Sequence, residues 1–193
     1  SIYMHLQDID NLKQTYGEED FVGHIGDTGH SYGKHLHFTL LNPVKKESEN
    51  PFRVLPVYND VKAPEIANFY IRIENKYIRI NDNSDIRLTK HYPLLVEIKD
   101  TIKGNEKLGL YKIKAVFNGK EVINYDFSKI GFSSSGLSVN NKTFGDLYDE
   151  MGYYKLNGLI YNEGINTLSL TVSDFNGNSS EKNFTINVNL DLQ

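Results

Sequence analysis

The chain has 193 residues, of which 39% are hydrophobic and 24% charged, a composition typical of one large or two small globular domains. Its formal charge of -4, with basic residues scattered among acidic ones, provides no basic surface for a phosphate backbone and argues against nucleic acid as a partner. The absence of cysteine excludes disulfides, thiolate catalysis and cysteine-ligated zinc. No apolar run reaches 18 residues, so no transmembrane segment is predicted.

The first 42 residues hold five of the six histidines together with a dense run of glycines. His35 and His37 lie one residue apart in the strand-like segment 34–40, which places both imidazoles on the same face of a strand. Two imidazoles on one face can bind one metal ion or act on one substrate. On its own, a His-x-His pair is more often packed or solvated than functional, and Gly-Asp-Thr-Gly alone is typical of a turn.

A proline-rich stretch follows. Residues 43–65 contain four of the five prolines and charges of both signs, which favours an extended connector on the surface. We therefore divide the chain into an N-terminal part (1–42), this connector (43–65) and a C-terminal module (66–193).

The C-terminal module alternates apolar and polar side chains, the pattern of half-buried strands. The segments with this pattern are 68–74, 94–100, 110–119, 121–127, 167–175 and 183–190. Asn118-Gly119 supplies the positive φ angles of a tight hairpin, and 174–182 predicts a second hairpin loop. One helical break is predicted over 143–156, where Leu147 and Met151 lie four residues apart. The predicted fold class is all-β, with an antiparallel β-sandwich in this module.

The end of the chain resembles a known kind of module. "GINTLSLTVSDFNGNSSEKNFTINV" (164–188) is similar to the final hairpin of the immunoglobulin-like modules attached to bacterial surface and envelope proteins. The resemblance implies an immunoglobulin-like β-sandwich and by itself says little about function.

Three motifs in residues 1–42, taken with their spacing, resemble the lysostaphin or LytM type of zinc metalloendopeptidase. "YMHL" (3–6) is similar to a Tyr-x-His-Leu segment of that family, "IGDTG" (25–29) to its glycine-rich loop, and "SYGKHLHF" (31–38) to its Ser-Thr-Gly-x-His-Leu-His-Phe segment. The resemblance implies that residues 1–42 are the C-terminal portion of a small peptidase domain built on an antiparallel sheet.

The resemblance also implies a role for each matching residue. His37 would ligate Zn2+, while His5 and His35 would serve as general base and as hydrogen-bond partner of the tetrahedral intermediate. Zinc lowers the pKa of a bound water to about 7, and imidazoles transfer protons near neutral pH. The residues expected to line the substrate groove are Tyr3, Gly26, Thr28, Gly29, Ser31 and Gly33.

The chain departs from the family pattern in its metal ligands. A catalytic zinc site of this class has three protein ligands, and the resemblance supplies only His37. The family carries the other two in an upstream His-x-x-x-Asp segment, and no histidine here is followed by Asp four residues later. Three explanations stay open: a fragment whose missing ligands lie on an upstream segment or another chain, a degenerate relative, or a rebuilt site using His24 or His30. Retention of His5, His35 and His37 favours the first.

The resemblance thus implies a zinc-dependent endopeptidase that cuts peptidoglycan peptides in the bacterial periplasm or cell envelope. The β-module would position the enzyme or dock an envelope protein. The alternative is a non-catalytic envelope protein, in which a degenerate peptidase fold binds peptidoglycan or a partner complex as a scaffold or activator.

Overall fold

The structure is a computed structural model, and it describes residues 1–8, 13–55, 59–101, 107–134 and 136–192. The chain forms two compact units, Ser1–Leu55 and Pro56–Gln193, which we call the N-terminal and C-terminal units. As predicted, the fold is all-β with antiparallel sheets. Within the described ranges, no helix has both the length and the apolar character needed to cross a membrane.

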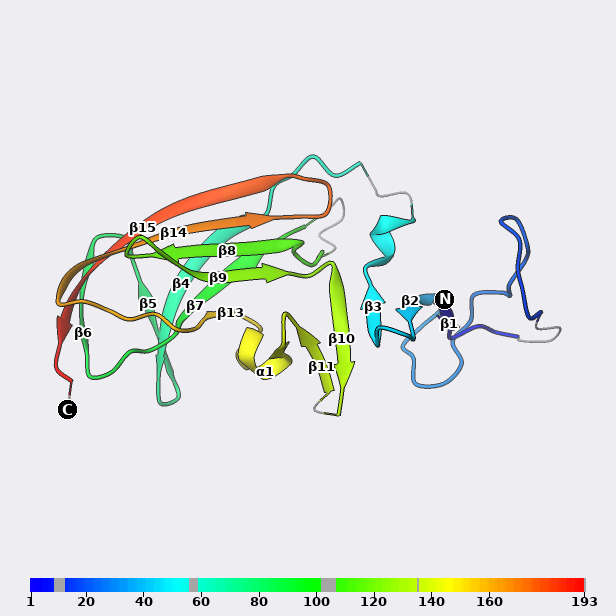
Figure 1. Cartoon of the computed structure of the whole chain (residues 1–193), viewed down its shortest axis with the longest axis horizontal. Helices are drawn as coiled ribbons and strands as arrows, with labels where there is room; N and C mark the ends of the chain where they lie inside the picture. The colour runs from blue at the N-terminus through cyan, green and yellow to red at the C-terminus, as the bar shows by residue number, and fades with distance from the viewer. Residues whose placement is uncertain (9–12, 56–58, 102–106, 135, 193) are drawn as a thin grey trace. The chain divides into compact units, whose positions relative to one another are not determined.

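The N-terminal unit contains three short strands and one 3-10 turn. They are β1 (Ile2–Met4), β2 (His37–Asn42), β3 (Glu47–Glu49) and η1 (Pro51–Arg53) (Figure 1). β1 pairs antiparallel with the start of β2, so that Met4 lies opposite His37, and β2 pairs antiparallel with β3. The strand predicted over 34–40 begins only at His37, because the three residues of β1 find their partners at positions 37–39.

Almost no hydrophobic core supports the N-terminal unit. Among its described residues, Leu6 is the single buried hydrophobic side chain. Larger apolar groups such as Phe21 and Leu36 are exposed. Backbone pairing and loop hydrogen bonds, rather than apolar burial, therefore determine its local geometry.

The predicted connector is more regular than expected. β3 and η1 both fall within 43–65, and the two units divide between Leu55 and Pro56. η1 begins there because the Asn50 side chain accepts a hydrogen bond from the backbone N–H of Phe52, while Pro51 occupies the first turn, where a missing N–H is harmless. Residues 56–58 of the predicted connector lie outside the described residues.

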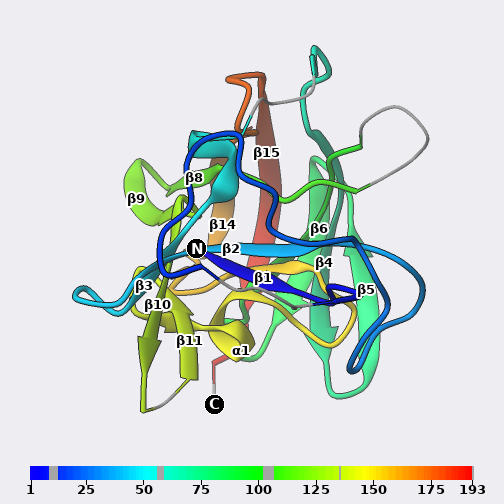
Figure 2. The ribbon, with the colours of Figure 1, turned by 90° about the vertical axis from the view of Figure 1, so that its right-hand side faces the viewer.

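Two β-sheets pack face to face in the C-terminal unit. The first has the order β13-β7-β4-β5, from β4 (Glu65–Ile73), β5 (Lys76–Ile80), β7 (Leu94–Lys99) and β13 (Tyr154–Leu156). The second has the order β6-β15-β14-β8-β9, from β6 (Ser84–Leu88), β8 (Lys112–Phe117), β9 (Lys120–Asp126), β14 (Gly164–Ser173) and β15 (Ser179–Leu190). Their pairings are antiparallel except that of β6 with β15, which is parallel. In Figure 2, β8, β9 and β14 lie on one side and β4 and β5 on the other.

Side chains from both sheets share one core. Leu168, Leu170 and Val172 of β14 are buried at every second position, as the alternating pattern predicts. Phe69 of β4 stacks on Phe184 of β15 with ring centroids 4.3 Å apart, which joins the two layers. Burial of alternating side chains against the opposite sheet therefore fixes the register of the sandwich.

The hairpin predicted at Asn118-Gly119 is confirmed. The two residues have φ angles of 49° and 78° and connect β8 to β9. The Asn118 side chain also donates to the Oδ1 of Asn166 at 2.8 Å. Asn166 is fully buried and its amide group donates in turn to the carbonyls of Asn162 and Gly164, so this polar group is satisfied inside the core.

The predicted helical break is much shorter than 143–156. Strands β10 (Lys129–Ser133), β11 (Gly136–Val139) and β12 (Lys142–Thr143) lead into α1 (Phe144–Leu147), a single turn. Asp146 begins it by accepting from the backbone and hydroxyl of Thr143. The chain leaves the helix at Tyr148, whose backbone is extended and forms a β-bridge with Tyr154. Strand pairing thus replaces the helix that Leu147 and Met151 suggested.

Candidate functional site

Three histidines that the sequence predicts to be functional come together in the N-terminal unit. His5 directly follows β1, His37 begins β2, and His35 precedes that strand by two residues. The ring centroid of His5 lies 4.7 Å from that of His35 and 6.0 Å from that of His37. The antiparallel register of β1 and β2 explains how positions so distant in sequence meet. We call these three residues the histidine cluster.

Backbone carbonyls orient two of the three rings. The Nδ1 atom of His5 lies 2.8 Å from the carbonyl oxygen of Thr28, and that of His35 lies 2.9 Å from the carbonyl oxygen of Gly33. Because a carbonyl only accepts, both Nδ1 atoms carry the proton, and in the neutral rings each Nε2 keeps its lone pair. This is the arrangement found behind histidines that bind a metal ion or accept a proton.

Gly26 joins the two oriented histidines through its backbone. Its N–H donates to the carbonyl of His5 at 2.9 Å, and its carbonyl accepts from the N–H of His35 at 3.2 Å. A Cβ atom at this position would lie 2.5 Å from the backbone nitrogen of Gln7, far inside contact distance. Gly26, predicted to line a groove, is therefore also a structural requirement of the cluster.

Other predicted groove residues lie around the same rings. The Thr28 hydroxyl donates to the carbonyl of Leu6 at 2.8 Å, which holds the carbonyl that orients His5. The Ser31 hydroxyl donates to the carbonyl of Gly33 at 3.1 Å and lies 3.3 Å from Nδ1 of His35. Through these contacts Thr28 and Ser31 help to hold the imidazoles of His5 and His35 in place.

Two glycines and Tyr3 complete the surroundings. Gly29 and Gly33 have φ angles of 75° and 88°, a left-handed conformation that favours glycine. A Cβ atom on Gly29 would lie 4.0 Å from Nδ1 of His5. Tyr3 packs against Phe38 with ring centroids 5.1 Å apart and so steadies the pairing of β1 with β2.

His5 itself has a left-handed backbone, with φ at 63°. Such a conformation is uncommon for a residue with a side chain and is held here by surrounding hydrogen bonds. His5 is half-buried, whereas His35 and His37 are exposed. The free Nε2 atoms thus belong to rings that the chain constrains at a surface that solvent reaches.

The cluster does not close a zinc site by itself. In a tetrahedral site the ligand atoms lie about 2.0–2.1 Å from zinc and therefore only about 3.4 Å from one another. Within the described ranges, three metal-ligating side chains bring all their ligand atoms within 4.8 Å only at Asp60, Asp100 and Asp174, in the C-terminal unit. If His37 is a zinc ligand, as the sequence comparison implies, the further ligands would have to come from outside the cluster.

The structure keeps the other two histidines of this unit apart from the cluster. Nδ1 of His24 lies 3.0 Å from a carboxylate oxygen of Asp8, and its ring packs against Phe21. The ring of His30 packs edge-on against Tyr32. A rebuilt metal site using His24 or His30 gains no support from these contacts.

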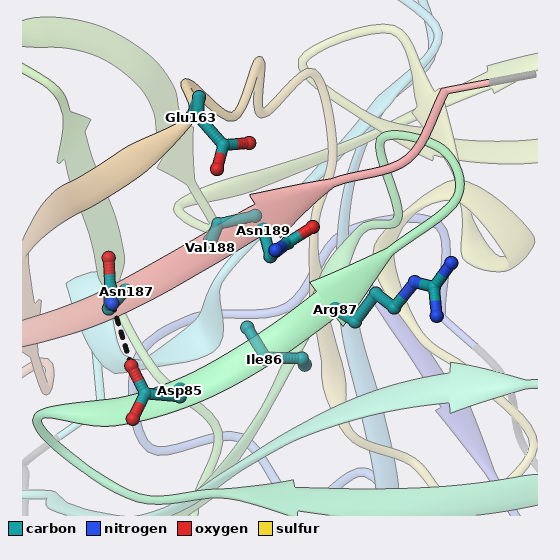
Figure 3. A pocket seen from close by; sticks show the side chains of 7 residues that line it. All are labelled: Asp85, Ile86, Arg87, Glu163, Asn187, Val188 and Asn189. Atoms are coloured by element: carbon teal, nitrogen blue, oxygen red, sulfur yellow. Dashed lines mark hydrogen bonds between the residues drawn. The ribbon is translucent and has the colours of Figure 1, made fainter.

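A separate pocket of about 400 Å³ lies on the C-terminal unit beside β6 and β15 (Figure 3). Its charged side chains already have partners. Asp85 accepts from the amide of Asn187 at 2.7 Å, Arg87 pairs with Asp191, and Glu163 accepts from the backbone of Leu190. The pocket therefore offers no free charge for a ligand.

The group formed by Asp60, Asp100 and Asp174 is not predicted from the sequence. Asp174 begins the predicted hairpin loop 174–182, and no motif includes the other two as site residues. Their separation along the chain hides their proximity, which only the packing of the sandwich creates.

The comparisons with known proteins concern the C-terminal unit. The model of one protein family matches residues 63–189, which is more than half of the chain. No curated protein and no solved structure matches. The predicted membership of the lysostaphin or LytM type of peptidase is wrong, because the family that matches is a different one and its model lies outside residues 1–42. Local backbone geometry alone can require glycines in a tight loop before a strand, as it does at Gly26. A similarity of glycines and histidines over so short a stretch therefore does not establish a family. The chain belongs to the family whose model spans residues 63–189.

Proposed function

We propose that the histidine cluster is part of the site of a zinc-dependent endopeptidase. The observation that carries this proposal is the pair of carbonyl contacts that hold Nδ1 of His5 and His35. These contacts leave Nε2 lone pairs on His5 and His35, and the ring centroid of His5 lies 4.7 Å from that of His35 and 6.0 Å from that of His37. Imidazoles held in this way can bind a metal ion and move protons at neutral pH.

Each histidine has a separate task in this proposal. His37 ligates zinc, which when bound lowers the pKa of a water and polarises a peptide carbonyl. Nε2 of His5 or His35 accepts a proton from the attacking water and later donates it to the leaving amine. The carbonyls of Thr28 and Gly33 stabilise each ring as it becomes positively charged, because each accepts the Nδ1 proton.

The remaining zinc ligands come, in this proposal, from outside the described residues of this chain. The reason is geometric, since the cluster offers one ligand and two flanking rings and no carboxylate contacts it in the described ranges. The exposure of His35 and His37 leaves them accessible to a second segment or a partner chain.

The proposed substrate is a peptide of bacterial peptidoglycan, cut in the periplasm or cell envelope. An exposed cluster flanked by Gly29 and Gly33 suits a polymer, because glycines let another backbone come close. In this proposal the C-terminal unit positions the site or docks an envelope protein.

Zinc titration of the protein isolated from its native source, which retains any further ligand-bearing segment or partner chain, tests the proposed ligand. We expect His37→Ala to weaken zinc binding at least tenfold in calorimetry, whereas the matched change His30→Ala leaves binding as it is, since His30 contacts Tyr32 rather than the cluster. For catalysis, the protein isolated from its native source should hydrolyse a peptidoglycan-derived peptide, with loss of activity in His35→Ala and in chelator. Equal zinc affinity of His37→Ala and the unchanged chain would contradict the proposal.

A non-catalytic role is the second candidate, and one observation favours it. The three imidazoles do not bring their ligand atoms close enough to close a metal site. In this case the unit binds peptidoglycan or a partner complex as a scaffold or activator. Co-sedimentation of the chain with peptidoglycan, unchanged by chelator and unaccompanied by hydrolysis, would establish this alternative.

A further inference from the structure

Three aspartates from separate segments meet in the C-terminal unit. Asp60 lies ahead of β4, Asp100 follows β7, and Asp174 follows β14. The carboxylate oxygens that they offer all lie within 4.8 Å of one another. Strand ends from both sheets of the sandwich therefore bring three formal negative charges to one point.

Asp100 is buried and has no hydrogen-bond partner among the described residues. It is only 4% exposed, and neither of its carboxylate oxygens accepts a hydrogen bond from that part of the chain. The Oδ2 atom of Asp60 is also buried, without a partner in the described ranges. A buried carboxylate without a donor is strongly unfavourable, and a protein retains one where a cation or a proton neutralises it.

Hydrogen bonds hold the other two aspartates in place. Oδ1 of Asp174 accepts from the backbone N–H groups of Asn176 and Asn178 at 2.8 and 2.9 Å. The amide of Asn178 donates both to Oδ2 of Asp174, at 2.7 Å, and to the backbone carbonyl of Asp60, at 3.0 Å. The β14–β15 loop is thus tied to the segment before β4, and the cluster is preorganised.

No basic side chain neutralises the cluster in the described part of the chain. Lys62 acts on Asp100 through its charge, yet its Nζ atom donates to the hydroxyl of Thr101 at 3.1 Å. Burial, followed by the nearby carboxylates of Asp174 and Asp60, raises the pKa of Asp100 to about 6. The site therefore carries uncompensated negative charge at neutral pH.

We propose that Asp60, Asp100 and Asp174 bind a Ca2+ ion. Calcium prefers carboxylate oxygens at about 2.3–2.6 Å, so oxygens up to 4.8 Å apart can contact one ion, with the remaining positions filled by water or carbonyls. Mg2+ demands an octahedron with shorter bonds of about 2.0–2.1 Å, which would require these oxygens to move closer. Asp100 also lines a surface pocket of about 360 Å³ next to the end of β7, which offers the ion a route in.

The bound ion would join three segments of the sandwich. It links the chain before β4 to the end of β7 and to the loop between β14 and β15. The site is independent of the histidine cluster, because every ligand belongs to the C-terminal unit. Its function is to stabilise this end of the sandwich in a calcium-containing environment.

Calcium titration of the whole chain, after removal of metal with chelator, tests the site. We expect Ca2+ to bind in calorimetry and to raise the melting temperature by several degrees, with a weaker effect of Mg2+. Asp100→Asn should lower the calcium affinity at least tenfold and abolish the shift. We expect this variant to keep the fold, because Asn has nearly the same size and the carboxylate that it replaces makes no hydrogen bond within the described residues.

Matched variants separate this site from other acidic groups. Asp85→Asn removes the same charge from an exposed strand position and should leave the calcium shift unchanged, because Asp85 contacts Asn187 and not the cluster. Asp174→Asn should lose binding as Asp100→Asn does. A calcium shift of the same size in Asp100→Asn as in the unchanged chain would overturn the proposal, as would tighter binding of Mg2+ than of Ca2+. The absence of calcium binding at millimolar concentration would overturn it as well.

Discussion

The two units of this chain differ in what holds them together. In the C-terminal unit, two sheets bury a shared core in which Phe69, Leu170 and Phe184 are almost wholly inaccessible. In the described part of the N-terminal unit, Leu6 alone is a buried hydrophobic residue, and the histidine cluster is fixed by backbone contacts. Stability resides mainly in the unit with the core, whereas the proposed catalytic groups depend on local loop geometry. Changes in one unit should therefore leave the other largely unaffected.

The largest effect should come from a cavity in the sandwich core. Leu170 of β14 is fully buried, so Leu170→Ala should reduce the free energy of unfolding by about 2–5 kcal/mol, from lost burial and the cavity left behind. Urea unfolding followed by far-ultraviolet circular dichroism measures this change. The matched control is Leu41→Ala on β2, which is 37% exposed and should have little effect on the same transition. Similar losses for the two variants would remove the distinction between the units.

A smaller effect concerns the pH dependence of the sandwich without metal. The pKa of Asp100 is about 6 in the folded protein against an ordinary value of 3.8 for an aspartate, so ionisation of its carboxyl opposes folding. The penalty is absent below about pH 4, grows between pH 4 and 6 and is complete above pH 6, where it amounts to about 2–3 kcal/mol at 1.36 kcal/mol per pKa unit. In the presence of chelator, the ionisation of Asp100 should therefore lower the free energy of unfolding as the pH rises from 4 to 6.

Asp100→Asn provides the comparison for that measurement. The variant cannot ionise at this position, so the difference between its unfolding free energy and that of the unchanged chain should vary between pH 4 and 7 in chelator. Saturating calcium should restore much of the stability of the unchanged chain near neutral pH, because the cation neutralises the same carboxylate. A difference that stays constant over this pH range would show that Asp100 has an ordinary pKa.

The sandwich could largely be predicted from the sequence, because the patterns that indicate its strands and turns are local. The alternation of apolar residues along β14 and the Asn118-Gly119 turn each reflect the conformation of their own segment. The strands β10 and β11 were missed, since their half-exposed side chains lack a clear alternation. The predicted helix over 143–156 failed for a different reason, because pairing of Tyr148 with Tyr154 overrode the spacing of Leu147 and Met151.

The two candidate sites could be predicted from the sequence to different degrees. His35 and His37 are neighbours in sequence, so their common location could be anticipated, although the strand begins only at His37. The meeting of Asp60, Asp100 and Asp174 depends on how distant strand ends pack, and no local pattern encodes it. The family expectation failed because it rested on short motifs, while the family match covers the sandwich.

Gly26→Ala should have the smallest effect on the sandwich and the largest effect on the histidine cluster. A side chain at position 26 would collide with the backbone of Gln7, with Cβ 2.5 Å from its nitrogen, so Gly26→Ala must displace one of the two segments. The hydrogen bonds of Gly26 with His5 and His35 would then be lost or lengthened. We expect altered imidazole nitrogen shifts for His5 and His35 in nuclear magnetic resonance spectra, and weaker zinc binding.

Unfolding of the C-terminal unit should stay the same in Gly26→Ala, because no residue of its core is touched. Gly17→Ala is the matched control: its added Cβ would find no atom closer than 3.7 Å, so the histidine signals should not move. Unaltered imidazole shifts in Gly26→Ala would show that the loop adapts without help from this glycine. A lowered stability of the sandwich in the same variant would instead show that the two units fold together, since a cluster held only by its own loop has no means of transmitting the change.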